Sequence, residues 1–105
     1  MQAIEYFYSA HSSYTWLGSA RFAQVAAAAG RPILHKPVDL NKVLAGAGST
    51  SFKERSEKFR NYFFFRELQR WSKCRNAPIF GRPQHHGNDP IVTNCMIISA
   101  QHQQL

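Results

Sequence analysis

The sequence predicts an α/β fold that opens with a strand–helix–strand unit and continues into further helices. Three observations support this prediction: an aromatic, strand-like run over residues 3–8, a helical pattern over residues 13–29, and a second apolar run over residues 33–38. Such a unit has parallel strands and a right-handed crossover. The composition agrees with a folded chain, because hydrophobic residues make up 44% of the 105 residues.

The boundaries of this unit follow from small polar and turn-forming residues. Small polar residues at positions 9–12 end the first run, and Gly30 with Pro32 close behind it ends the helical pattern. The run over residues 33–38 alternates poorly between apolar and polar side chains, which suits a strand covered on both faces.

The second half of the chain is expected to be mainly helical. Small, flexible residues at positions 45–50 read as a linker. Ser51 and Glu54 then match a capping box, which predicts a long helix from there to about Lys73. Residues 76–90 are expected to form a loop, and a further helical pattern begins at Ile91.

The predicted long helix carries four consecutive aromatic residues at positions 62–65. Each residue turns a helix by about 100°, so these four side chains cannot all point to one side. Some of them must therefore meet a second surface, either a neighbouring helix or a partner subunit.

The net charge of +7 is concentrated in residues 53–75, which hold eight basic and three acidic residues. A basic helix can meet nucleic acid, an anionic substrate or only water. The acids interspersed among the bases favour a solvated helix face, and no recognised nucleic-acid-binding motif accompanies the charge. Nucleic acid is therefore not the expected partner.

The chain is expected to be cytoplasmic. No apolar run approaches the roughly 20 residues that span a bilayer, and the first residues lack the basic and apolar regions of a signal peptide. Cys74 and Cys95 form no Cys-x-x-Cys pair, so free thiols are expected in a reducing compartment.

Residues 4–17, IEYFYSAHSSYTWL, resemble the opening of the 2-hydroxychromene-2-carboxylate isomerases and the kappa-class glutathione transferases. These proteins begin with an aromatic-rich strand, a Ser-Pro step and an aromatic residue followed by leucine. The segments PVDL (37–40), ELQRW (67–71) and NCMII (94–98) extend the resemblance in order and spacing. One departure is Ser13, which stands where the family usually has proline.

The resemblance implies a thioredoxin-like fold of the DsbA family. Residues 1–44 would form its N-terminal βαβ half, and residues 45–105 part of a helical insertion. The family's sheet continues with two further strands, so the sheet is expected to be incomplete in this chain.

The resemblance places Ser12 where related oxidoreductases carry their first active-site cysteine. Unpaired N–H groups and the helix dipole favour negative charge at the start of a helix. A serine cannot form a disulfide, but its hydroxyl can donate to the thiolate of a bound glutathione. The alternative is that Ser12 or Ser13 only caps the helix, which stabilises it by about 1 kcal/mol.

The remaining ligand contacts are expected from three residues. Ser13 and Ser49 are expected to bind glutathione with Ser12. Lys36, at the end of the second predicted strand, is expected to attract a substrate carboxylate, although a plain surface lysine is the equal alternative.

Histidines give no strong prediction. His11 could act as a base or could be a solvent-facing loop residue. His85 and His86 lie beside each other near Asp89, but they lack the second spaced pair that a zinc site requires. No metal site is predicted.

The leading functional expectation is a glutathione-dependent isomerase or transferase, in which the glutathione thiolate adds to and leaves a conjugated aromatic pyruvate. Its partners would be a small aromatic carboxylate and further copies of itself in a homo-oligomer. The alternatives are a truncated, inactive, self-associating fragment of that fold and a basic nucleic-acid-binding module.

Overall fold

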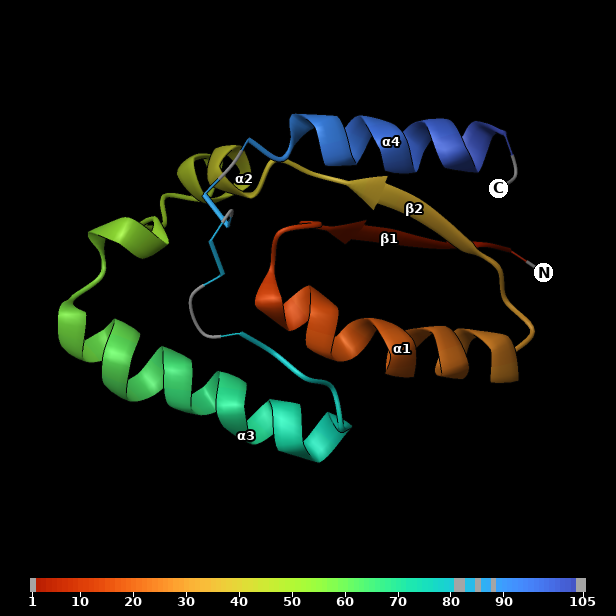
Figure 1. Ribbon diagram of the computed structural model, residues 1–105. Coiled ribbons are helices and arrows are strands. Elements are labelled where there is room, and N and C mark those ends of the chain that lie inside the picture. Colours follow the sequence, from red (N-terminus) through yellow and green to blue (C-terminus); the bar gives the residue numbers. More distant parts are fainter. Residues whose placement is uncertain (1, 81–82, 85, 88, 104–105) are drawn as a thin grey trace.

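The computed structural model describes residues 2–80, 83–84, 86–87 and 89–103 and has a mixed α/β architecture (Figure 1). Its elements are β1 (Ile4–Tyr8), α1 (Ser13–Ala28), β2 (Ile33–Pro37), α2 (Leu40–Gly46), the 3₁₀ turn η1 (Phe52–Glu54), the π-helical segment η2 (Phe59–Phe64), α3 (Phe65–Arg75) and α4 (Ile91–His102). The predicted strand–helix–strand unit is confirmed, because β1 and β2 pair in parallel with α1 between them.

One face of the two-stranded sheet packs against α1. Side chains alternate between the faces of a strand, and the register pairs Tyr6 with His35. The Tyr6 ring stacks on the Tyr8 ring at 4.3 Å and meets the Phe22 ring of α1 at 4.5 Å. Tyr6 therefore provides an aromatic contact between the sheet and α1.

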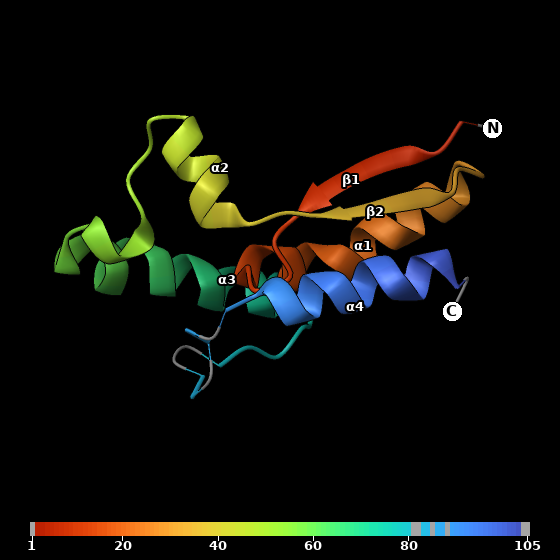
Figure 2. The same ribbon diagram turned by 90° about the horizontal axis from the view of Figure 1, so that it is seen from above.

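The other face of the sheet is left open by the described part of the chain. It carries two cross-strand pairs, Glu5 with Leu34 and Phe7 with Lys36, and Phe7 is 60% exposed. Figure 2 shows α1 and α4 on the same side of the strands. The expectation that the second strand is covered on both faces is therefore wrong for this structure.

Helix α4 lies along the outer edge of β2 and shields it (Figure 1). The Gln101 side chain accepts a hydrogen bond from the His35 N–H at 2.7 Å and donates one to the His35 carbonyl at 3.2 Å. Asn94 donates to the Val38 carbonyl at 3.4 Å. The side-chain amides take the place of a third strand and satisfy backbone groups that an edge strand leaves unpaired.

Replacing Gln101 by alanine should lower the free energy of unfolding by about 1–2 kcal/mol, because both backbone groups of His35 lose their partner. Amide exchange at His35 should accelerate in parallel. Chemical denaturation and hydrogen exchange measure the two effects. Gln103→Ala is the matched control, since Gln103 is the exposed C-cap residue of α4 and its side chain donates to the Ser99 hydroxyl, not to β2. Equal effects of the two substitutions would contradict this role of Gln101.

The helices on the α1 side meet in a small core. Leu17 and Ala26 of α1 and Leu68 of α3 are the buried hydrophobic residues in the described chain. The indole N–H of Trp16 also donates to the Pro78 carbonyl at 2.9 Å, which ties α1 to the segment after α3. The sequence places this segment in a loop, and the described residues between 76 and 90 form one.

The predicted start of the long helix at residue 51 is wrong, whereas its end at Arg75 lies close to the predicted one. Ser51 makes no side-chain capping bond, and Arg55 is extended, with ψ of 152°, so the chain leaves the helical path after η1. Ser56 makes the capping bond instead, because its hydroxyl accepts from the Phe59 N–H at 3.1 Å. The helix then passes through the π-helical segment η2 and continues as α3.

Helix α2 was not predicted from the sequence. Its N-cap is Asp39, whose carboxylate accepts from the Asn41 N–H at 3.1 Å and the Lys42 N–H at 3.4 Å. The linker expected over residues 45–50 is confirmed only after this helix ends, where Gly48 has a positive φ of 73°.

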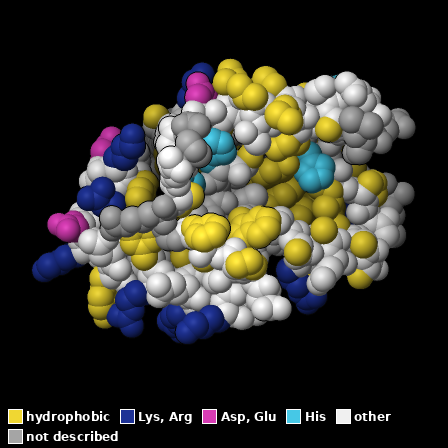
Figure 3. Space-filling view, viewed as in Figure 1, with side chains coloured by type: hydrophobic (Ala, Val, Ile, Leu, Met, Phe, Trp, Pro, Cys, Tyr) yellow, Lys and Arg dark blue, Asp and Glu magenta, His cyan; other side chains and the backbone are white. Residues whose placement is uncertain are grey.

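The four consecutive aromatic residues divide between two surroundings, as expected. Phe64 and Phe65 are half-buried, whereas Tyr62 is 70% and Phe63 50% exposed. The Arg66 guanidinium lies 4.6 Å from the centre of the Tyr62 ring. Lys and Arg side chains gather on this side of the molecule (Figure 3). Self-association through the exposed aromatic residues stays a prediction.

Among the described residues, no helix has the length and apolar character that crossing a membrane requires.

Candidate functional site

The turn between β1 and α1 sets the position of Ser12. Ser9 is buried at 7% exposure, and its carbonyl accepts from the Ser12 N–H at 3.1 Å. The Ser9 hydroxyl accepts from the His11 N–H at 3.3 Å. These two bonds fold the chain tightly after the strand, so that Ser12 begins the helix at the carboxyl end of β1.

Ser12 is the N-cap of α1, as one of the two sequence interpretations expected. Its hydroxyl oxygen accepts from the Thr15 N–H at 3.3 Å, and its carbonyl accepts from the Trp16 N–H at 3.1 Å. The N–H groups of Ser13 and Tyr14 donate to no acceptor among the described residues. A capping hydroxyl still has its own proton to donate. The cap and a role towards a ligand are therefore compatible.

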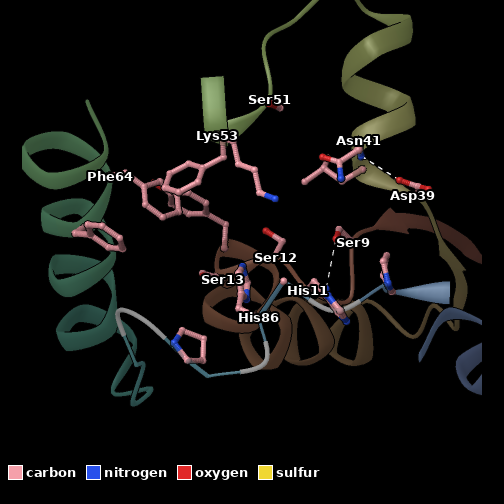
Figure 4. Close-up of a pocket in the computed structure, with 17 residues that line it drawn as sticks. Ser9, His11, Ser12, Ser13, Asp39, Asn41, Ser51, Lys53, Phe64 and His86 are labelled. Atoms are coloured by element: carbon pink, nitrogen blue, oxygen red, sulfur yellow. Dashed lines mark hydrogen bonds between the residues drawn. The ribbon is translucent and has the colours of Figure 1, made fainter. Parts of the chain in front are cut away.

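Ser12 faces a cavity of about 660 Å³. The cavity lies between the β1–α1 turn, the start of α2, η1, the junction of η2 with α3, and the loop before α4 (Figure 4). Its volume falls within the roughly 300–1,000 Å³ of small-molecule sites. Its lining residues come from several segments of the chain. They are Ser9, His11, Ser12, Ser13, Tyr14, Asp39, Leu40, Asn41, Ser51, Phe52, Lys53, Phe64, Phe65, Pro83, His86, Gly87 and Pro90.

Aromatic rings form one wall of the cavity. The centre of the Phe64 ring lies 4.6 Å from that of Phe52, 5.7 Å from that of Tyr14 and 5.6 Å from that of Phe65. Burial, and secondarily the negative charge of Glu67, raises the pKa of the Tyr14 phenol. The wall suits an apolar, flat ligand.

Hydrogen-bond donors also line the cavity. Lys53 extends from η1 into the space, and its ammonium group points toward Ser12 (Figure 4). His11 and His86 lie near each other, with ring centres 6.3 Å apart. Asp39 is the acidic residue of the lining, but its carboxylate is already bonded to the first turn of α2. The arrangement favours an anionic ligand.

The structure brings together some of the predicted site residues and separates others. Ser12 and Ser13 line the cavity, whereas Ser49 and Lys36 do not. Ser49 lies exposed after α2, where its N–H donates to the Leu44 carbonyl at 2.9 Å. Lys36 projects from the open face of the sheet, away from α1, and forms an ion pair with Glu5 at 3.0 Å.

The histidines and cysteines show no metal-binding arrangement in the described part of the chain. No group of three or more His, Cys, Asp or Glu side chains is placed to hold a metal ion there. His86 and Asp89 lie in the loop before α4, and His85 lies outside the described residues. Cys74 and Cys95 are free, as expected, and both are exposed.

Lys53 and Asn41 are cavity residues that the sequence did not reveal. In the sequence, Lys53 is one of the eight basic residues between positions 53 and 75, and no motif singles out Asn41. The signal that could have indicated Asn41 is the preceding Asp39, a strong N-cap residue directly after a strand. Lys53 had no such signal, because its position depends on the break in the chain at Arg55.

Comparisons of the chain with protein-family models, with curated proteins and with solved structures give no match.

Proposed function

We propose that this chain is the glutathione-binding part of a thioredoxin-like protein similar to the 2-hydroxychromene-2-carboxylate isomerases. The observation that carries the proposal is Ser12, which begins α1 directly after β1 with its side chain in a cavity. The parallel βαβ unit supports it as well, because a thioredoxin-like fold begins with such a unit.

The donors around Ser12 fit a thiolate. The Ser12 hydroxyl can donate its proton to a sulfur anion while its oxygen keeps the capping bond to Thr15. The N–H groups of Ser13 and Tyr14 lie at the same helix start, where the dipole of α1 stabilises negative charge. Glutathione would supply the nucleophilic thiol that this chain lacks at that point.

The aromatic wall fits the second ligand of such a reaction. Phe52, Phe64 and Tyr14 offer flat apolar surface beside the Ser12 hydroxyl. A conjugated aromatic pyruvate could stack there, with its carboxylate towards the donors and its chain near the thiolate. The residues of this chain would thereby orient the two reactants and exclude part of the water.

Titration of the ¹⁵N-labelled chain with glutathione tests the proposal. Millimolar glutathione should shift the backbone resonances of Ser12, Ser13 and Tyr14, because their N–H groups lie where the sulfur anion would bind. S-Methylglutathione is the control ligand, since it cannot form a thiolate, and it should bind more weakly. The proposal is wrong if glutathione shifts none of the three resonances, or if both ligands bind equally well.

A further inference from the structure

Two lysines compete for the role of binding a ligand's anionic group, and the structure separates them. Lys36 lies on the open sheet face, with its ammonium nitrogen 3.0 Å from a Glu5 carboxylate oxygen and 5.3 Å from the centre of the Phe7 ring. Both interactions keep its charge away from the cavity. Lys36 is thus partly neutralised and lies outside the lining.

Lys53 has the opposite surroundings. It lines the cavity and points toward Ser12 (Figure 4), and it forms no ion pair with a described residue. The lining's acid, Asp39, is occupied by two backbone N–H groups of α2. The ammonium group of Lys53 therefore brings a positive charge that no described side chain neutralises.

The position of Lys53 beside the aromatic wall defines the kind of ligand it would select. Phe52 precedes it in the same 3₁₀ turn, and the Phe52 ring packs 4.6 Å from the Phe64 ring. The cavity therefore offers flat apolar surface and a cation within one short segment. A ligand with an aromatic body and a carboxylate would meet both.

We propose that Lys53, and not Lys36, determines the preference of this cavity for carboxylate-bearing aromatic ligands. The proposal rests on the proposed function in one respect, that the same cavity is the binding site. It assigns Lys53 a role in specificity, in which the ammonium group pairs with the ligand's carboxylate while the aromatic wall holds its ring.

Binding of trans-cinnamate and of its uncharged amide, cinnamamide, followed by ¹⁵N chemical shifts, tests this assignment. Because Lys53 is solvent-exposed, the loss of its charge should weaken cinnamate binding only about fivefold. Lys53→Gln should show this loss for cinnamate and leave cinnamamide unchanged, and Lys53→Arg should restore cinnamate binding. Lys36→Gln is the matched control and should leave both ligands unchanged.

Several outcomes overturn the assignment. It fails if cinnamate binds equally well to Lys53→Gln and to the unaltered chain, if Lys36→Gln shows the larger loss, or if the unaltered chain binds no cinnamate. Glutathione titration of the same samples keeps the two proposals apart. Lys53-dependent cinnamate binding without any glutathione binding would reject the glutathione proposal and support Lys53. Glutathione binding at Ser12, with cinnamate binding independent of Lys53, would support the glutathione proposal and reject the role of Lys53.

Discussion

Replacing Leu68 by alanine is expected to lower the free energy of unfolding by about 2–5 kcal/mol. Leu68 is 2% exposed and is the buried residue of α3, which packs against α1. With Leu17 and Ala26 it makes up the buried hydrophobic core of the described chain. Because such a small core provides only a small free energy of unfolding, the variant should lose its cooperative unfolding transition in urea. Circular dichroism measures this transition.

Gln69→Ala is the control for this substitution. Gln69 is the next residue of α3 and is exposed, so its replacement changes the helix surface without opening a cavity. Its effect should stay within about 0.5 kcal/mol. If Leu68→Ala changes the free energy of unfolding by no more than Gln69→Ala does, the packing of α3 on α1 contributes little to the stability of the chain.

The strand–helix–strand unit could be predicted because its signals are local. Residues 4–8 alternate towards and away from α1, and Gly30 takes the positive φ of 65° that glycine allows at a helix end. The open face of the sheet could not be predicted in the same way. Whether Phe7 and Leu34 are covered depends on where distant helices pack. A poorly alternating sequence in β2 is compatible both with a strand covered on two faces and with a strand that has one open face.

The start of the third helix shows how two local signals can compete. Ser51 with Glu54 and Ser56 with Phe59 both offer a serine cap before an apolar run, and the second is the one that forms its bond. The extended backbone at Arg55 separates them. Sequence patterns alone cannot decide between two such serines, since each capping bond contributes only about 1 kcal/mol.

Only one part of the candidate site, the turn that carries Ser12, could be predicted from the sequence. Ser12 follows from the order of strand, turn and helix, which a sequence pattern contains. The other walls come from η1, the start of α3 and the loop before α4, which reach the cavity through tertiary packing. Lys53 therefore gives no signal in the sequence, and His86 gives only the weak one of a histidine pair. Lys36 gives a signal at a strand end, but it lies on the open face.

Ser12→Ala is expected to raise the pKa of a glutathione thiol bound at α1 by about one to two units. A hydrogen bond to a charged group is worth roughly 1.5–3 kcal/mol, and each pKa unit corresponds to about 1.4 kcal/mol. The dipole of α1 remains in the variant, so glutathione should still bind near the helix start. The measurement is a pH titration of the cysteinyl methylene resonance of ¹³C-labelled glutathione bound to each protein.

The cap that Ser12 provides for Thr15 complicates this substitution, because alanine also removes the acceptor. Ser12→Gly separates the two roles. Glycine costs a helix start only a few tenths of a kcal/mol, whereas alanine costs about 1 kcal/mol. Both variants lack the hydroxyl, so both should raise the thiol pKa, while only alanine should lower the unfolding free energy appreciably. Ser13→Ala should change the thiol pKa little. If the thiol pKa is the same in Ser12→Gly, Ser13→Ala and the unaltered chain, the Ser12 hydroxyl serves only as the helix cap.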